Sequence, residues 1–259
     1  MFNFVRGNNV VVKDPRVKRL LEFSEKIPGK DLVPVLVEEA APLIREDPFA
    51  FALAAVLDRG QKAEVIWTLP YFIKKQVGTL DPHFFANASL DELSKIFQEL
   101  PRKPRYVGDA PRTVKELSKI VVNEYDGKVE RIWNNRRSES VKATFRRVFG
   151  VGPGIASMIV LLLEKWYDVH FDDLDHARMD VKPDAHDVRV FHRLGFISEP
   201  KEGLAVDVAR RLNPEYPGAL DAPTWTIGKN WCTSYNPKCH DCPVREACPK
   251  YGVLKKTLT

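Results

Sequence analysis

The residues with the clearest chemical potential are four cysteines that lie together near the C-terminus. They are Cys232, Cys239, Cys242 and Cys248, and their spacing reads C-x6-C-x2-C-x5-C. Thiolates bind soft metal ions and iron–sulfur clusters, and no other cysteine in the chain is left to form a core disulfide. A zinc ribbon normally has two C-x2-C pairs, whereas this segment has one. The cysteines alone therefore indicate a thiolate-bound metal site, either an iron–sulfur cluster or zinc.

A second candidate is the glycine-rich turn Gly150-Val151-Gly152-Pro153-Gly154. A basic segment that we expect to be a helix ending at Phe149 precedes it, and an almost wholly apolar helix is expected to follow. Glycines allow a tight turn, and the unpaired amides at the start of the second helix form an anion site. A DNA phosphate would fit this site. A plain corner between two helices is the alternative.

A third candidate is a carboxylate that precedes a regular series of basic residues, in the order Asp184, His186, Arg189 and Arg193. A fixed carboxylate stabilises a positive charge that develops in a reaction, and it can orient an attacking water. Asp184 follows a proline, so the alternative is that it only caps a helix.

Along the chain the hairpin comes first, then Asp184 and then the cysteine loop, and in this order the three segments resemble the helix-hairpin-helix superfamily of DNA glycosylases that includes endonuclease III. Its hairpin typically reads Leu-Pro-Gly-Val-Gly, and an Asp-x-His-x-x-Arg-x-x-x-Arg pattern begins the helix with the catalytic aspartate. Its cysteine loop has the same C-x6-C-x2-C-x5-C spacing and holds a [4Fe-4S] cluster, so the resemblance implies such a cluster here, with zinc as the alternative. The resemblance covers residues from about 47 to 248 and implies that Asp184 is catalytic. It favours Asp184 over Asp180 and Asp187, because only Asp184 carries the matching offsets.

The resemblance also implies that the partner is double-stranded DNA with a damaged or mismatched base. Gln61 aligns with the glutamine that fills the stack when the target base is flipped; an ordinary loop residue is the alternative. The DNA-contacting set is then Gln61, Gly150, Val151, Gly152, Gly154, Arg189 and Lys238.

One departure from the superfamily concerns the lysine that bifunctional members place just after the hairpin, where its amine attacks the sugar. Gly154 stands at that position here. The resemblance therefore predicts a monofunctional glycosylase without lyase activity. A lyase that uses a displaced lysine, Lys165 or Lys182, is one alternative, and a non-catalytic damage sensor is another. Removal of adenine is disfavoured, because neither Asp58 nor Glu64 matches the acid of the adenine glycosylases.

The elements that must position these residues read as helices. Helix starts are expected at Asp14, Asp47, Ser89 and Asp109, the third within a capping box, and Gly60 is expected to end the second helix. No convincing alternation of polar and apolar residues indicates strands. The sequence thus predicts an all-α fold.

The resemblance implies two helical lobes with a DNA-binding cleft between them. Residues 46–166 would form a six-helix lobe that carries the hairpin. Residues 1–45 and 167–259 would form the iron–sulfur lobe. The weak strand candidate at 10–12 does not change this interpretation. The acidic insertion at 168–183 is expected to be a solvated loop; a metal site and a segment that shapes the substrate pocket are the alternatives.

The composition of the chain bears on its partners and its location in the cell. The chain has 259 residues, a net charge of +5, and basic groups such as Arg102, Lys103 and Arg105, which suit a polyanionic partner without requiring one. It contains neither an apolar run of transmembrane length nor a signal-peptide pattern. We expect a cytoplasmic, nucleoid-associated monomer.

Overall fold

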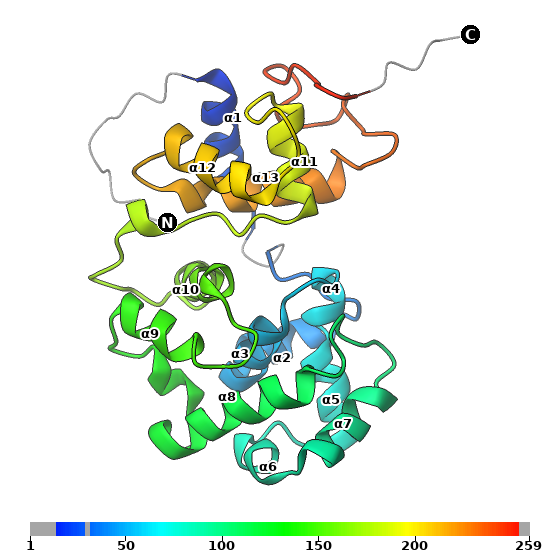
Figure 1. Ribbon diagram of the computed structural model, residues 1–259, viewed down its shortest axis with the longest axis vertical. Helices are drawn as coiled ribbons and strands as arrows, with labels where there is room; N and C mark the ends of the chain where they lie inside the picture. Colours follow the sequence, from blue (N-terminus) through cyan, green and yellow to red (C-terminus); the bar gives the residue numbers. More distant parts are fainter. Residues whose placement is uncertain (1–13, 29–31, 254–259) are drawn as a thin grey trace. The chain divides into compact units, whose positions relative to one another are not determined.

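The computed structural model describes residues 14–28 and 32–253, and in these ranges the chain forms helices and connecting loops without any β-strand (Figure 1). The all-α prediction is confirmed, while the strand candidate at 10–12 lies outside the described residues. Contacts divide the chain into two compact units. We call Pro28–Leu174 the central unit, and Met1–Ile27 together with Asp175–Thr259 the terminal unit.

The central unit is assembled around α3, a helix that is apolar on every side. All residues from Phe49 to Leu57 are buried, as expected for a helix without a polar face. Its neighbours include α2, α5, α8 and α10. The helices of this unit are α2 (Ala40–Glu46), α3 (Pro48–Leu57), α4 (Ala63–Ile66), α5 (Leu69–Val77), α6 (Pro82–Asn87), α7 (Leu90–Glu99), α8 (Ala110–Tyr125), α9 (Ser138–Phe145) and α10 (Pro153–Trp166).

The bounds of the central unit are wider than the expected lobe at 46–166, which lies inside them. On the N-terminal side, α2 packs against α3 and α5. On the C-terminal side, the Tyr167 ring lies 4.9 Å from that of Phe51, and its hydroxyl donates to the Ile44 carbonyl. Asp173 also binds this unit, accepting a hydrogen bond of 2.7 Å from the Ser138 amide. These contacts attach residues on both sides of the expected lobe to the central unit.

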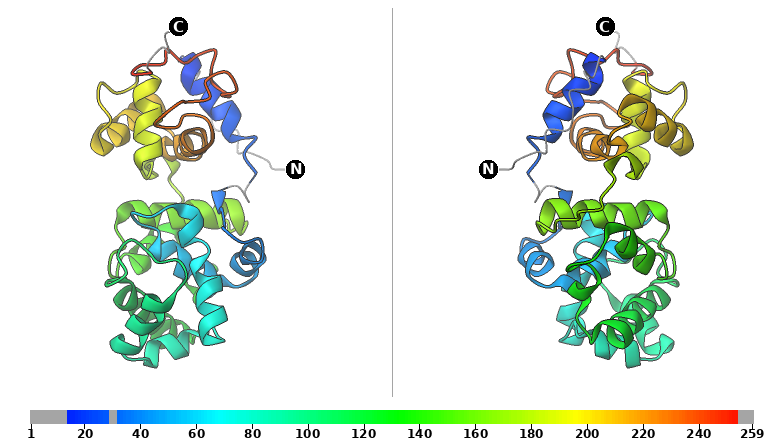
Figure 2. Two further views of the ribbon diagram at one scale, coloured as in Figure 1. Left: turned by 90° about the vertical axis from the view of Figure 1, so that its right-hand side faces the viewer. Right: turned by 90° about the vertical axis from the view of Figure 1, so that its left-hand side faces the viewer.

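The terminal unit joins two segments that are far apart in the sequence. Figure 2 shows α1, from the N-terminal segment, beside helices of the C-terminal segment. Gly228 of α13 faces His186 of α11 so closely that a Cβ atom would come within 2.6 Å of the His186 Cβ. The helices of this unit are α1 (Pro15–Ser24), α11 (Ala185–Arg193), α12 (Glu202–Leu212) and α13 (Asp221–Asn230).

Three of the predicted helix starts are confirmed with their capping bonds. Asp14 and Asp47 each accept backbone N–H bonds from the first turns of α1 and α3. Ser89 and Glu92 form the complete capping box of α7. Each bond satisfies an amide that would otherwise lack a partner at the start of a helix.

The predicted helix start at Asp109 is also confirmed, since Asp109 is the N-cap of α8, although its side chain makes no capping bond. Two details of the predicted helices are wrong. Gly60 does not end α3, whose C-cap is Asp58; it lies further on, in a turn with φ +67°. The basic helix α9 ends at Phe145 rather than Phe149, because the next four residues form turns whose last backbone groups bind α8. Among the described helices, none is long and apolar enough to cross a membrane.

Candidate functional site

The predicted hairpin is present as the connection between α9 and α10 in the central unit. Gly150 has φ +83°, in the left-handed region that glycine adopts without strain. Gly152 is the N-cap of α10, and a Cβ added to it would meet no atom within 4 Å. The turn therefore requires a glycine at position 150, whereas at position 152 the glycine leaves open space beside the backbone.

The start of α10 has no capping side chain. Its first helical bond runs from the Ala156 amide to the Gly152 carbonyl. The amides of Gly154 and Ile155 precede that bond, in the turn where helix N–H groups lack intrahelical partners. Val151 is 7% exposed and its amide donates to the Val148 carbonyl at 3.1 Å, so this residue shapes the turn rather than offering an amide to a ligand. The amides that the turn presents are those at the start of α10.

The hairpin is fixed to α8 through backbone groups of Phe149. The Phe149 amide donates to Glu116 Oε2 at 2.7 Å, and its carbonyl accepts from Thr113 Oγ1 at 3.0 Å. Two bonds to a sixteen-residue helix give the turn a rigid support. Sequence reasoning missed both partners, because neither residue has a type or spacing that indicates the contact.

Gln61 is exposed in the loop between α3 and α4, also in the central unit. Its Nε2 donates to the Lys103 carbonyl at 3.3 Å, and its Oε1 accepts from the Lys62 amide at 3.0 Å. It lines a hollow of about 770 Å³ together with Lys62, Arg102, Lys103 and Arg105. The fold therefore places the basic group at 102–105, noted in the sequence, beside the residue expected to enter the duplex.

Asp184 lies at the start of α11 in the terminal unit, where it is half-buried. Its Oδ1 accepts from the His186 amide at 2.6 Å and from the Asp187 amide at 3.1 Å. The Asp187 carboxylate in turn accepts from the Asp184 amide at 3.2 Å, which completes a capping box. The capping role that the sequence left open is present, and the catalytic role stays a prediction.

Asp187 is a buried acid whose importance the sequence did not reveal. It is 1% exposed, and the Thr224 hydroxyl donates to its Oδ1 at 2.6 Å. Burial, together with the negative charges of Asp221 and Asp184, raises the pKa of Asp187 well above its ordinary value. The residue that the sequence offered as a rival to Asp184 therefore holds its proton more tightly than an ordinary carboxyl.

Arg189 is directed into its own unit. Its guanidinium donates to the carbonyls of Cys232 at 2.6 Å and Gly228 at 2.9 Å, and lies 2.9 Å from Nδ1 of His186. These bonds join α11 to α13 and to the cysteine loop. Its predicted contact with DNA stays a prediction, but the structure shows a supporting role for this side chain.

Arg193 supports the same loop one turn further along α11. It donates to the carbonyls of Thr233 at 2.7 Å and Ser234 at 3.1 Å, and it lies 3.4 Å from the Cys232 sulfur. The side chain is 8% exposed, so these bonds satisfy a buried charge. The two arginines of the sequence pattern thus connect the helix that begins at Asp184 to the cysteine loop. Lys238 is exposed in that loop.

The four cysteines line one cavity of the terminal unit, together with Arg193, Trp231, Arg245, Lys250 and Val253. All four are partly buried free thiols. Burial, with the charges of the other three cysteines, raises the pKa of Cys242 to about 11. The fold therefore brings together four sulfur donors that span seventeen residues of sequence, Cys232 to Cys248.

The arrangement of these thiols bears on what they can hold. The four irons of a [4Fe-4S] cluster each take one thiolate. Four thiols around one cavity fit such a cluster in their donor chemistry. Within residues 14–28 and 32–253, no three His, Cys, Asp or Glu side chains are grouped as ligands of a single metal ion.

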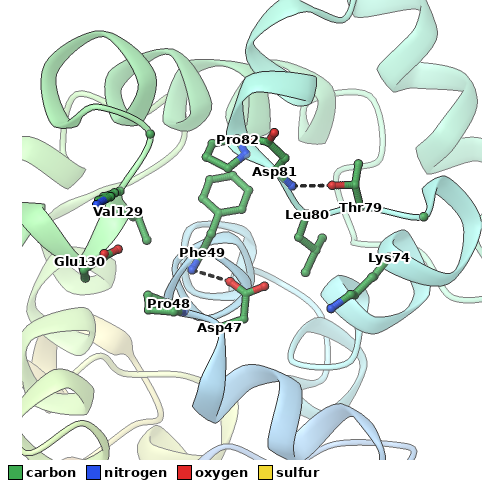
Figure 3. A pocket seen from close by; sticks show the side chains of 13 residues that line it. Asp47, Pro48, Phe49, Lys74, Thr79, Leu80, Asp81, Pro82, Val129 and Glu130 are labelled. Atoms are coloured by element: carbon green, nitrogen blue, oxygen red, sulfur yellow. Dashed lines mark hydrogen bonds between the residues drawn. The ribbon is translucent and has the colours of Figure 1, made fainter.

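A different hollow, of about 350 Å³, lies on the central unit at the start of α3 (Figure 3). Asp47 and Lys74 point into it, and Asp81 lies at its edge. Both carboxylates already cap helices, Asp47 through the Phe49 amide and Asp81 through the His83 amide. We therefore assign no chemistry to this hollow.

Comparison with known proteins gives matches to structures only, since no protein-family model and no curated protein matches the chain. A trapped covalent endonuclease III–DNA intermediate, an estranged-adenine complex, has a TM-score of 0.60 and 16% identity, covering 91% of this chain and 95% of that one. A non-covalent endonuclease III–DNA complex has a TM-score of 0.59 and 18% identity, with coverages of 91% and 94%.

A thermostable thymine-DNA glycosylase is also similar, with a TM-score of 0.55, 17% identity and coverages of 91% and 94%. At such identities the likeness establishes the fold and leaves the activity open. The chain therefore has the all-helical fold of the endonuclease III-like DNA glycosylases, which confirms at the level of the fold the resemblance seen in the sequence.

Proposed function

We propose that this protein is a DNA-repair glycosylase that hydrolyses the N-glycosidic bond of a flipped, damaged or mismatched base. The observation that carries the proposal is the uncapped hairpin start of α10 within an endonuclease III-like fold. Unpaired amides at the positive end of a helix dipole bind an anion, and a DNA phosphate is the anion that this fold's relatives meet. The solved endonuclease III structures are DNA complexes, which supports DNA as the partner.

Asp184 is proposed as the catalytic residue. Bonds from two backbone amides hold the carboxylate in one orientation at the start of α11. An ionised carboxylate stabilises the positive charge that develops on the sugar, and it can take a proton from the attacking water. Burial and the nearby charges of Asp221 and Asp184 raise the pKa of Asp187 well above its ordinary value, so the Asp187 carboxyl is the weaker candidate for the catalytic anion.

The reaction is proposed to stop at an abasic site. The first turn of α10 carries Gly154, which has no side chain to attack the sugar. Lys165 lies on α10 and Lys182 two residues before Asp184, and either remains the alternative source of an amine. A bifunctional enzyme and a non-catalytic damage sensor are therefore the rival functions that the experiment must separate.

The four cysteines are proposed to hold a [4Fe-4S] cluster, which when bound would cross-link the loop through iron–thiolate bonds. The chain's own residues already support that loop, since Arg189 and Arg193 bind its backbone carbonyls. Exposed Lys238 then lies on a loop with a fixed conformation, where its charge can meet a phosphate. We propose that the cluster has this structural role and takes no part in the excision.

The test is base excision from short duplexes, each with a single lesion or mismatch, followed by gel analysis with and without hot alkali. Strand breaks only after alkali are expected, because alkali cleaves the abasic site that a monofunctional enzyme leaves. Breaks without alkali would establish a lyase instead. Tight binding without excision across a broad panel would favour the damage sensor. Iron and acid-labile sulfide, measured on anaerobically purified protein, test the cluster separately.

A further inference from the structure

The side chain of Arg59 lies where three connecting segments of the central unit meet. Arg59 itself lies in the loop between α3 and α4, two residues before Gln61. Its guanidinium reaches Tyr106 and Asp109 in the connection between α7 and α8. It also reaches the hairpin, at Phe149 and Gly150. One partly buried side chain, 22% exposed, therefore contacts both other segments.

The contacts of this guanidinium differ in kind. Arg59 Nη2 lies 3.2 Å from Asp109 Oδ2, an ion pair. Its Cζ lies 5.1 Å from the Tyr106 ring centroid and 5.7 Å from that of Phe149, within the range of cation–π attraction. A planar cation can make these contacts together, whereas a lysine ammonium lacks the plane.

The contact with Gly150 is the closest. A Cβ atom added there would come within 2.3 Å of Arg59 Nη1, so the guanidinium occupies the volume that any other residue's side chain would fill. The loop of Gln61 approaches Tyr106 in the same manner, because a Cβ at Gly60 would lie 3.1 Å from Tyr106 Cε2. Two glycines thus permit the packing that surrounds this side chain.

We propose that Arg59 is a positioning residue that sets the Gln61 loop relative to the hairpin, so that phosphate binding and duplex insertion occur in one fixed geometry. This inference rests on the proposed function. The hairpin would bind the DNA backbone while Gln61 enters the DNA base stack. Arg59 would fix the position of one loop relative to the other without touching the reacting atoms. Its effect would be on base flipping rather than on the affinity for DNA.

The matched control is Arg112. Its Cζ lies 4.0 Å from the centroid of the same Phe149 ring, and its Nε donates to Glu116 at 2.8 Å. Neither of these contacts involves Tyr106 or the Gln61 loop. Arg59→Met and Arg112→Met therefore both remove a charge and a stacking contact from Phe149, but only Arg59→Met separates the hairpin from Gln61.

The experiment measures duplex insertion in the absence of chemistry. The probe is a short duplex with a tetrahydrofuran abasic analogue beside 2-aminopurine, whose fluorescence rises when the stack is opened. We expect Arg59→Met to lower the insertion equilibrium at saturating protein roughly tenfold, while the dissociation constant and its salt dependence stay near those of the wild type. Arg112→Met should leave the insertion signal unchanged.

Two further variants test whether a defect of Arg59→Met comes from the lost contacts or from unfolding. Gly150→Ala should displace the Arg59 guanidinium and reproduce the insertion defect. Arg59→Lys, which keeps the charge, should restore only part of the insertion signal. Equal signals for wild type and Arg59→Met would overturn the inference and leave the proposed function standing. So would weaker binding with a smaller salt dependence but full insertion, because Arg59 would then be a simple phosphate contact. A wild-type protein that neither binds nor opens the duplex would contradict the proposed function itself.

Discussion

The helices α10 and α11 begin in opposite ways. The start of α10 has a glycine N-cap and no capping side chain. The start of α11 has Asp184 and Asp187, which form a reciprocal capping box. Both helix starts carry the partial positive charge of unpaired amides. At the start of α11 the protein's own carboxyl groups accept hydrogen bonds from backbone amides. At the start of α10 no side chain does so, and the amides can bind a ligand.

This difference shows how one physical feature can serve binding in one place and organise a reactive group in another. A capping side chain at the N-terminus of α10 would stabilise the helix by about 1 kcal/mol, but Gly152 stands at that position. The carboxylate at α11 gains two amide bonds that hold it in one orientation. We infer that the start of α10 binds a phosphate of the DNA, and that the start of α11 orients the carboxylate of Asp184.

The largest expected effect is that of Asp184→Asn on excision. Asparagine caps helices as well as aspartate does, so the fold should persist. The loss of the negative charge should slow the single-turnover excision rate roughly 10²- to 10³-fold. The control is Asp47→Asn, which alters the N-cap of α3 and should excise normally. Normal excision by Asp184→Asn would leave that residue with its capping role alone.

The hairpin turn is tested by Gly150→Ala, measured by thermal or urea unfolding. A positive φ alone costs about 1 kcal/mol in a residue with a Cβ. Gly78 provides that reference, because it has φ +85° and nothing within 4 Å of an added Cβ. Gly150→Ala should cost about 2 to 3 kcal/mol, since the Cβ also displaces Arg59. The excess over Gly78→Ala should disappear in an Arg59→Met background; if it persists, Arg59 is not its cause.

The open space at Gly152 leads to an opposite prediction for the neighbouring glycine. Gly152→Ala meets no atom within 4 Å and has a φ of −90°, so the free energy of unfolding should hardly change. A methyl group there should hinder a phosphate and weaken duplex binding about tenfold, as seen by fluorescence anisotropy. Gly203→Ala on α12, also in open space, is the control. Unchanged affinity in Gly152→Ala would favour the plain helix corner.

The capping box at α11 should make stability depend on pH. The pKa of Asp187 is raised in the folded protein, so its contribution to stability is full at low pH and is lost as the pH rises through the folded pKa. Asp187→Asn removes this titration, and its advantage over the wild type should grow toward alkaline pH. Urea unfolding across the pH range measures the difference. A constant difference at every pH would show that the pKa of Asp187 is the same in the folded and unfolded states, and would contradict this prediction.

The smallest effect is expected in the cysteine loop, at Lys238. An exposed lysine that meets one phosphate contributes mainly to the salt dependence of binding. Lys238→Ala should lower the slope of log affinity against log salt by about 1, with little change in excision at low salt. Lys95→Ala, on the exposed face of α7, should change neither. An identical slope for wild type and Lys238→Ala would remove this lysine from the DNA contacts.

Local features were predictable from the sequence because their signals are local. The caps at Asp47 and Ser89 and the glycine hairpin depend on residues within a few positions of each other. The all-helical fold followed from the same signals and from the family resemblance. The four cysteines were predicted as a group, and the fold places them around one cavity.

What the sequence did not reveal depends on contacts between distant segments. Arg59 meets Gly150 across ninety-one positions, and Thr224 binds Asp187 across thirty-seven. Neither pair has a periodicity or motif that could indicate it. The end of α9 was misplaced for the same reason, because Phe149 leaves the helix to bind Glu116 of α8. Tertiary bonds of this kind override local helix propensity.

The most direct test of the account measures duplex affinity and single-turnover excision on the same samples of wild type, Gly152→Ala and Asp184→Asn. We expect the two effects to separate: Gly152→Ala loses affinity but excises at the wild-type rate when DNA is saturating, and Asp184→Asn binds normally but excises roughly 10²- to 10³-fold more slowly. If both variants lose affinity and rate together, the uncapped start of α10 and the capped start of α11 do not have the separate roles assigned to them.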